Sequence, residues 1–430
     1  MSTTAAPKRD GLAAYVAVTA AYWAFMLTDG ALRMLVLLHF HTLGFSPIQL
    51  AYLFLLYEFM GIVTNLSAGW IAARFGLTST LYAGLSLQIV ALAALTQLDP
   101  SWQVAASVAF VMAVQGVSGV AKDLAKMSSK SAVKVLAPAN EKGALFRWVA
   151  VLTGSKNAVK GVGFLLGAVL LGVIGFTGAV AAMGVALAVI FAAVAVFMPS
   201  GLPVGRKDAK FREVFSKDPN VNRLSAARLF LFGARDTWFV VGIPIYFYSV
   251  LSDGTPDGDR AAFFQIGTFM AVWIIGYGFV QAAAPKLLQA ADRDLSDIVG
   301  LARRWVGILT LIPAALAAAA FAGHAADPAP WLTVTLIVGL LLFGVVFALN
   351  SSLHSYLILA FTKAARVTMD VGFYYMSNAA GRLVGTLLSG LSYQLGGLTL
   401  CLATAAVMSA LSFLFAGQLQ RTMVVAPDPV

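Results

Sequence analysis

The sequence predicts an all-α integral membrane protein of twelve spanning helices, arranged as two halves of six. Hydrophobic residues make up 60% of the 430 residues, whereas charged residues make up only 11%. The mean hydropathy of +0.85 excludes an ordinary soluble domain. Apolar segments of about 20 residues or more, the length at which a helix crosses a bilayer, recur along the whole chain.

The first half holds six expected spans. The first apolar stretch, from about Leu12 to Phe40, is too long for a secretory signal and lacks a cleavage pattern, so we expect it to remain as a spanning helix. The sequences HTLGFSP and LDPSW follow the first and third spans and are typical of turns between helices. The expected spans are 13–39, 47–73, 79–98, 102–126, 144–174 and 177–198.

The second half follows the longest polar connection of the chain. Residues 199–222 are rich in lysine and arginine, and they predict a cytoplasmic linker between one half at 1–198 and another at 223–430. The sequence ADPAP predicts a turn after the ninth span. The remaining expected spans are 223–250, 261–287, 302–323, 331–359, 370–395 and 398–419.

Basic residues lie almost entirely on one side of these spans. With the N-terminus inside, the basic loops are cytoplasmic, and the opposite loops hold only Arg260 beside three aspartates. This asymmetry predicts a multi-pass membrane protein with both termini in the cytoplasm, and we expect its membrane to be the bacterial inner membrane. Because topology accounts for most of the net charge of +10, we expect the lipid bilayer as surroundings and no nucleic acid partner.

Two lysines, Lys156 and Lys160, lie near the middle of the fifth span. A charged side chain in hydrocarbon costs at least about 2.5–3.5 kcal/mol on insertion scales, so such residues usually have a use. Since they are four residues apart, both lie on one face of the helix. Two interpretations follow: acids from other helices neutralise the lysines, or the missing anion is a substrate.

Acidic side chains also fall within the spans. Asp29 and Arg33 are four residues apart in the first span. They either form an intrahelical ion pair, or Arg33 binds an anion that Asp29 orients. Glu58 of the second span either pairs with a lysine of the fifth span or exchanges protons during transport.

The seventh span carries Arg235 and Asp236 near its centre. Neighbouring side chains point about 100° apart on a helix, so we expect Arg235 to face the bundle and Asp236 to pair with a neighbour. Arg228, nearer the cytoplasmic end, is expected to snorkel. Arg382 lies in the middle of the eleventh span with no acid close to it in sequence.

Cations outnumber acids among these candidate interior residues. The cations are Arg33, Lys156, Lys160, Arg235 and Arg382. The acids are Asp29, Glu58 and Asp236. Uncompensated charge in a low dielectric is costly unless water or an anion is bound. The expected ligand is therefore a multiply charged small-molecule anion, because arginine captures tetrahedral oxyanions bidentately and lysine adds a point charge.

Polar residues recur at matching places in the two halves. In the fifth span Asn157 is followed by Lys160, and in the eleventh span Asn378 is followed by Arg382. The fourth and tenth spans carry polar residues at equal intervals after a glycine, and these add Lys126 and Asn350 to the predicted substrate-binding set. The pattern suggests that the polar residues of one half face those of the other.

Lysines recur every four residues at the end of the fourth span, which places them in one stripe if the helix continues. They either anchor the cytoplasmic side or form an electrostatic funnel for anions. These lysines are Lys122, Lys126, Lys130 and Lys134.

Nothing in the sequence indicates a cofactor or catalysis. A single cysteine, Cys401, cannot build a thiolate metal cage, and the four histidines are too scattered for a metal site. Neither a Ser-His-Asp set nor a G-x-x-x-x-G-K-[ST] loop is present. We therefore expect no metal, no cofactor and no enzyme activity; a membrane enzyme or a non-transporting sensor is the alternative class.

Six plus six helices around a basic linker is the layout of the major facilitator superfamily, whose halves are repeats around a midplane site. Five blocks, which include YEFMGIVTN and SGVAKDLAKMSSKSAVK, closely resemble the ArsJ-type organoarsenical efflux permeases of that superfamily; they lie at 22–47, 57–65, 118–134, 146–167 and 224–241. The resemblance implies export of 1-arseno-3-phosphoglycerate and a functional link to glyceraldehyde-3-phosphate dehydrogenase, which makes this ester. It supplies no binding residues, so the predicted site rests on charge; the fold implies a monomer.

This substrate suits the residues. The ester carries a tetrahedral oxyanion at each end, so Lys156 and Lys160 of one half and Arg235 and Arg382 of the other are each expected to take one end. Trivalent arsenic would need grouped thiolates, which one cysteine excludes. Another organic phosphate remains an alternative substrate. We expect proton exchange to drive export, although uniport or anion exchange would suffice because membrane voltage favours anion export by about 2.3 kcal/mol per charge per 100 mV.

Overall fold

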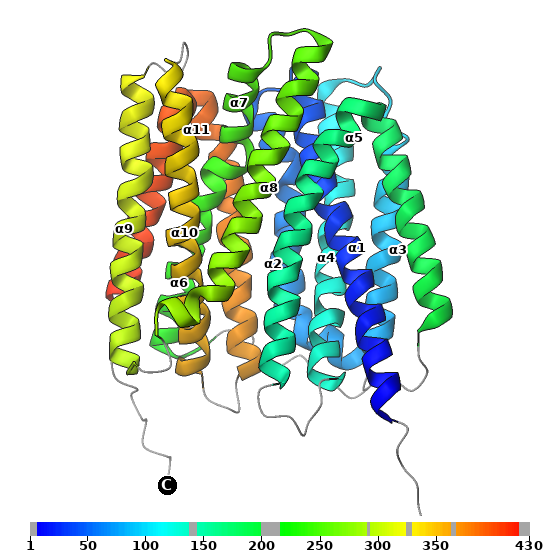
Figure 1. Ribbon diagram of the computed structural model, residues 1–430, viewed down its shortest axis with the longest axis vertical. Helices are drawn as coiled ribbons and strands as arrows, with labels where there is room; N and C mark the ends of the chain where they lie inside the picture. Colours follow the sequence, from blue (N-terminus) through cyan, green and yellow to red (C-terminus); the bar gives the residue numbers. More distant parts are fainter. Residues whose placement is uncertain are drawn as a thin grey trace, which may run out of the picture.

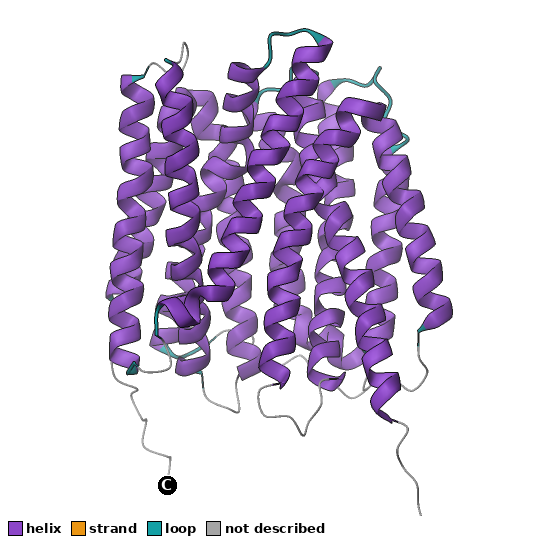
Figure 2. Cartoon of the chain, viewed as in Figure 1, coloured by secondary structure: helices purple, strands orange, loops and turns teal. Residues whose placement is uncertain are grey.

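The computed structural model describes residues 7–136, 144–198, 216–289, 293–323, 329–362 and 367–420. This part of the chain is entirely helical and contains no strand (Figure 2). Ten of its helices are long and apolar enough to cross a membrane. The predicted all-α class is therefore confirmed. Most of the linker expected at 199–222 lies outside the described residues.

The first five helices cover the N-terminal half of the chain. They are α1 (Pro7–Thr42), α2 (Pro47–Phe75), α3 (Leu77–Leu95), α4 (Val104–Leu136) and α5 (Ala144–Phe197). α5 contains two expected spans, because its 54 residues are interrupted at Gly175, where φ is 69°. Glycine adopts this left-handed conformation without a steric penalty, so the chain turns there between its two arms.

The remaining helices cover the C-terminal half. They are α6 (Pro219–Thr237), the π-helical turn η1 (Trp238–Gly242), α7 (Ile243–Leu251), α8 (Pro256–Leu287), α9 (Leu295–Ala322), α10 (Pro330–Phe361) and α11 (Val367–Gly417). α11 also joins two expected spans, across a break at Gly396 and Gly397. With α5 and α11 counted as two arms each and α6, η1 and α7 as one crossing, the described helices cross twelve times, as predicted.

The helices run side by side along the long axis of the molecule (Figure 1). The first turn of α1 and the last turn of α11 lie at the same end, which we call the termini end, and the other end is the far end. α1 packs against α5, and α6 packs correspondingly against α11. Between the two halves, α5 packs against α8 and α2 against α11. Two similar helix pairs thus face each other around the middle of the bundle.

Glycines allow the closest of these contacts. Added Cβ atoms at Gly163 and Gly167 of α5 would collide with the backbone of α1, and added Cβ atoms at Gly381 and Gly385 of α11 would collide with the backbone of α6. Small residues four apart let the backbones of membrane helices approach each other in this way. The pairing brings the charged residues in the middle of each helix within reach of its partner.

The crossing made of α6, η1 and α7 changes its hydrogen bonding just beyond its central charges. Pro244 has no N–H, so the α-helical pattern cannot continue regularly through this turn. The hydroxyl of Ser389 on α11 accepts from the backbone N–H groups of Val241 and Gly242, at 3.1 and 3.2 Å. The thiol of Cys401 donates to the carbonyl of Thr237 at 2.9 Å. α11 thus stabilises a π-helical turn, a feature that often accompanies functional sites.

Candidate functional site

Seven ionisable residues meet in the middle of the bundle, and we call them the central charge network. They are Asp29 and Arg33 of α1, Glu58 of α2, Lys160 of α5, Arg235 and Asp236 of α6 and Arg382 of α11. Four are cations and three are acids. All seven belong to the set predicted from the sequence. Ion pairs join five of them, and the pair of Asp29 and Lys160 lies beside these five through Tyr57, whose hydroxyl donates to Asp29 and whose ring centre lies 5.6 Å from the guanidinium of Arg33.

Glu58 links the two halves of the molecule. Its Oε1 atom accepts from Nη1 of Arg33 at 2.9 Å and from Nη2 of Arg382 at 2.6 Å. Arg33 lies on α1 in the same half, whereas Arg382 lies on α11 in the other half. Only 1% of the Glu58 side chain is exposed. One buried carboxylate is therefore shared by two guanidinium groups from opposite halves.

Asp29 forms the second ion pair of the N-terminal half. Its Oδ2 atom lies 2.9 Å from Nζ of Lys160, and its Oδ1 atom accepts from the hydroxyl of Tyr57 at 2.5 Å. The predicted alternative of an ion pair between Asp29 and Arg33 is therefore wrong. Spacing by four makes such a pair possible, but α5 and α2 offer each residue a partner from another helix.

This geometry also bears on the two roles predicted for Glu58. The expected pair between Glu58 and a lysine of the fifth span is wrong, because the ion-pair partners of Glu58 in the described part of the chain are both arginines, and Lys160 pairs with Asp29. Glu58 reaches Arg33 and Arg382 instead. A role for Glu58 in proton exchange stays a prediction.

Asp236 is the acid of the C-terminal half. Its Oδ1 atom lies 2.5 Å from Nη2 of Arg235, and its Oδ2 atom lies 3.5 Å from Nε of Arg382. Asp236 has neighbouring partners, as expected, and one of them is Arg235, although helix geometry sends the two side chains in different directions at Cβ. The arginine side chain is long enough to bend back onto its neighbour, and its guanidinium also lies 4.9 Å from the ring of Phe232.

A second polar group, the termini-side cluster, lies next to the network in the N-terminal half. Its members are Thr64 and Asn65 of α2 and Lys122, Asp123 and Lys126 of α4. Lys126 donates to Asn65 at 2.9 Å and pairs with Asp123 at 3.2 Å. The Nζ atom of Lys122 lies 4.0 Å from the ring centre of Tyr57, which also contacts Asp29. The two groups are therefore adjacent.

Asp123 is not among the site residues predicted from the sequence. It is buried, it accepts from Thr64 at 2.6 Å, and it neutralises part of the lysine stripe. An acid placed directly after Lys122 within an apolar span was the available signal. The stripe continues along α4 through Lys130 and Lys134, whose side chains lie outside the described residues.

Arg228 is buried rather than snorkelling, so that expectation is wrong. Only 4% of the residue is exposed. Its guanidinium donates to the backbone carbonyl and hydroxyl of Ser351 at 3.0 Å each and to Asn378 at 3.2 Å. These bonds tie α6 to α10 and α11 and give Asn378 a structural partner.

The other predicted binding residues lie in different surroundings. The amide of Asn157 donates to Gln281 of α8 at 3.2 Å, across the two halves. Lys156 is half-buried one residue before it. Asn350 is fully buried and donates to the carbonyl of Ala302 on α9 at 3.2 Å, so the structure directs this amide away from the network.

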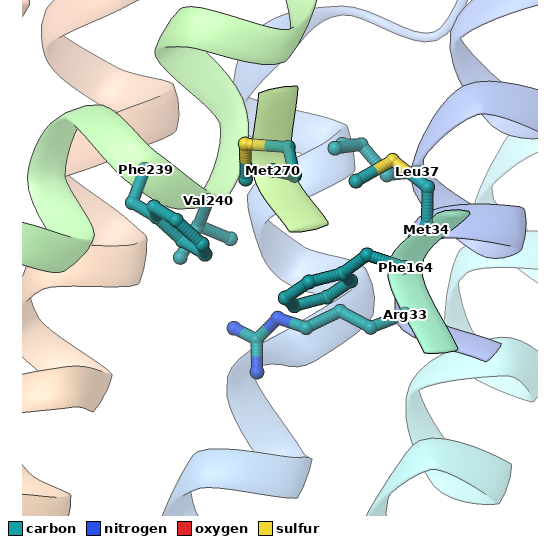
Figure 3. Close-up of a pocket in the computed structure, with 7 residues that line it drawn as sticks. All are labelled: Arg33, Met34, Leu37, Phe164, Phe239, Val240 and Met270. Carbon is teal, nitrogen blue, oxygen red and sulfur yellow. The ribbon is translucent and has the colours of Figure 1, made fainter. Parts of the chain in front are cut away.

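An apolar layer covers the network on its far-end side. A small pocket of about 10 Å³ lies between Arg33 and six apolar side chains (Figure 3). The apolar residues are Met34, Leu37, Phe164, Phe239, Val240 and Met270. About one water molecule fits such a volume. Met34 and Leu37 follow Arg33 along α1 toward the far end, so the layer separates the charges from that end.

Close packing between the halves continues beyond this layer. At Gly390 of α11, an added Cβ would lie 3.0 Å or less from atoms of Pro47, Ile48 and Ala51 of α2. The side chain of Gln394 also accepts from the backbone N–H of Ile48 at 3.2 Å. Contacts of this kind leave no space for a solute between α2 and α11 at the far end.

The described residues contain no group of three or more His, Cys, Asp or Glu side chains that could hold a metal ion. Cys401 is buried and bonded to a backbone carbonyl in the apolar interior. The ionisable groups in the middle of the bundle are instead mostly cations, and their common property is attraction to anions.

A buried charge network between two similar helix groups is typical of a membrane carrier. The family model of the Major Facilitator Superfamily matches residues 15–293, and the chain belongs to that superfamily. It therefore has the predicted twelve-helix fold, with two six-helix halves in a pseudo-twofold arrangement, and is a secondary transporter.

Solved transporters share this fold. A POT family transporter in complex with a thioalcohol-conjugated peptide is 12% identical, with a TM-score of 0.70 over 93% of this chain and 94% of that one. A POT family transporter in complex with 5-aminolevulinic acid is also 12% identical, with a TM-score of 0.71 and the same coverage. The nucleoside transporter NupG is 15% identical, with a TM-score of 0.64 over 96% of this chain and 99% of that one. Among curated proteins, none matched this sequence.

Proposed function

We propose that this transporter exports the anionic organoarsenical 1-arseno-3-phosphoglycerate from the cytoplasm by alternating access and so confers resistance to arsenate. The observation that carries the proposal is the surplus of cations in the central charge network. Arg33, Lys160, Arg235 and Arg382 stand against three acids. The adjacent termini-side cluster adds two lysines and one acid. These residues together carry a net positive charge, and an anion is the ligand that would balance it.

The placement of the cations supports a ligand with two charged ends. Arg33 and Lys160 belong to the N-terminal half, and Arg235 and Arg382 belong to the C-terminal half. The ester has a tetrahedral oxyanion at each end of a three-carbon chain, so each half can hold one end. Guanidinium groups bind such oxyanions through two parallel hydrogen bonds. A ligand that bridges the halves can couple its own binding to their relative movement.

The direction of transport rests on the asymmetry of basic loops. The asymmetry supports a termini end that faces the cytoplasm, and the membrane of the proposal is the bacterial inner membrane. The apolar layer and the glycine contacts then close the site toward the outside. A cytoplasmic anion would enter from the termini end, past Lys126 and Lys122. A functional link to glyceraldehyde-3-phosphate dehydrogenase follows, because that enzyme makes the ester from arsenate.

The test uses everted membrane vesicles that contain the protein and are supplied with labelled arsenate. Arsenic should accumulate only when glyceraldehyde-3-phosphate dehydrogenase, its triose substrate and NAD are all present. Accumulation with arsenate alone would instead establish an arsenate carrier. No accumulation under either condition, with the protein inserted, together with uptake of labelled 3-phosphoglycerate, would establish the alternative function of an organic phosphate carrier.

Matched variants connect the activity to the site. Arg382→Gln should abolish accumulation at normal membrane abundance, because it removes a cation of the network. Arg304→Gln is its control, since Arg304 is exposed on α9. Lys160→Gln and Lys286→Gln form a second pair, with Lys286 exposed on α8. Wild-type accumulation by both Arg382→Gln and Lys160→Gln would refute the proposed site.

A further inference from the structure

Glu58 occupies the place where an anion would meet both halves. Its Oε1 atom lies between Nη1 of Arg33 and Nη2 of Arg382, at 2.9 and 2.6 Å. These distances are those of strong charge-assisted hydrogen bonds. The carboxylate therefore holds two guanidinium groups that a bound oxyanion would otherwise use.

This internal pairing leaves hydrogen-bonding capacity unused. Among the described residues, Oε2 of Glu58 and Nη2 of Arg33 are buried without a hydrogen-bond partner. Nε of Arg382 is in the same condition, 3.5 Å from Oδ2 of Asp236. Buried polar atoms of this kind are costly and normally find partners. A tetrahedral oxyanion has more acceptor positions than one carboxylate oxygen and would satisfy these donors better.

We propose that Glu58 is an internal competitor for the anion, and that it takes up a proton when the anion displaces it from Arg382. The proposal rests on the proposed function, because it requires an oxyanion as the ligand. The proton comes from water on the side from which the anion enters. It binds the displaced carboxylate, and it leaves when Glu58 returns to Arg382 after the anion has gone.

The groups around Glu58 support this exchange. Arg33 of α1 and Arg382 of α11 face it directly, and Asp236 of α6 shares Arg382 with it. Lys122 of α4 is also nearby, because its Nζ atom lies over the ring of Tyr57, the residue that precedes Glu58. Once an anion engages the arginines, a charged Glu58 would stand buried beside a second negative charge, and protonation removes that repulsion.

The proposal also specifies the direction in which the proton moves relative to the anion. Because the anion and the proton bind together, one proton travels outward with each exported anion. Glu58 therefore favours cotransport of a proton with the anion, in contrast to the proton exchange expected from the sequence. Obligatory uptake of one proton makes anion affinity rise about tenfold for each unit by which pH falls.

The experiment measures sulfate binding to the purified full-length protein by calorimetry at several pH values. Sulfate is a tetrahedral dianion whose charge stays constant over the mildly acidic to neutral range. Wild-type affinity should rise about tenfold per unit of falling pH, with uptake of one proton per bound ion. Glu58→Gln should bind at least about tenfold more tightly at neutral pH, without pH dependence. Glu58→Asp, which keeps the charge, should retain the wild-type slope.

Each other outcome has a clear meaning. Weaker or unchanged binding by Glu58→Gln would overturn the proposal and make Glu58 a structural ion-pair partner. A wild type that binds sulfate without proton uptake would overturn it even if Glu58→Gln fails to fold. If neither protein binds sulfate or 3-phosphoglycerate, the failure belongs to the proposed function, because the site is then not an oxyanion site.

Discussion

The helix pairs α1–α5 and α6–α11 solve the same packing problem with similar residues. Each pair approaches closely at glycines spaced by four, namely Gly163 and Gly167 in α5 and Gly381 and Gly385 in α11. Each pair also places an acid opposite a cation. Asp29 of α1 faces Lys160 of α5 at 2.9 Å, and Asp236 of α6 faces Arg382 of α11 at 3.5 Å.

The two pairs differ in how their charges are balanced. In the N-terminal half, Asp29 and Glu58 balance Lys160 and Arg33. In the C-terminal half, Asp236 alone stands against Arg235 and Arg382, and α8 has no acid between Gly267 and Ala284. Glu58 crosses to the C-terminal half and neutralises the excess. A near-symmetrical scaffold can thus hold its halves together through an asymmetry of charge.

The largest expected effect is a loss of stability on removal of Lys160, which should exceed the loss on removal of Arg382. Lys160→Gln leaves Asp29 buried without the only ion-pair partner that it has in the described part of the chain. Removing one member of a buried pair costs about 3–5 kcal/mol, so the unfolding temperature in detergent should fall strongly. Arg382→Gln should shift it much less, because Glu58 keeps Arg33 and Asp236 keeps Arg235.

A double variant checks this explanation. Combining Lys160→Gln with Asp29→Asn removes both charges, and most of the lost stability should return. Equal losses for Lys160→Gln and Arg382→Gln would mean that the difference between the halves is not one of charge compensation.

Much of the scaffold was predictable from the sequence, for a physical reason. A bilayer demands long apolar helices, so composition alone marks the spans and the turns between them. The breaks at Gly175 and at Gly396 and Gly397 fall where the expected spans meet. The seven residues of the central network were also recognisable, because charge within an apolar span stands out.

The pairing within the network was not predictable from spacing. Sequence distance favours partners on the same helix, whereas Asp29 and Glu58 both form ion pairs with cations of other helices. Such choices depend on helix rotation, which the packing of glycines and side chains determines. For the same reason Arg228 looked peripheral although it is buried among α10 and α11.

A smaller effect tests whether close approach of the backbones is needed in the C-terminal pair. A Cβ at Gly381 would collide with the backbone of Leu229, so Gly381→Ala forces α6 and α11 apart. Overpacking of this kind typically costs about 1–3 kcal/mol. Gly276→Ala is the matched control, because nothing lies within 4 Å of the added Cβ there. The unfolding temperature in detergent should fall for Gly381→Ala and stay unchanged for Gly276→Ala. If both variants unfold like the wild type, the glycine contact does not hold the pair.

The smallest expected effect concerns the π-helical turn, which interrupts the seventh crossing of the molecule, the first of the C-terminal half. Ser389→Ala removes the hydroxyl that accepts from Val241 and Gly242, so stability should fall by about 1 kcal/mol, the net value of a typical hydrogen bond. Ser409→Ala is the control, because among the described residues that hydroxyl bonds to Ala405 of its own helix and to no other element. Because the turn begins at Trp238, two residues after Asp236, loosening it should also weaken anion binding at the central charge network. A variant that unfolds earlier yet binds sulfate normally would show that the turn stabilises the crossing without positioning its charges.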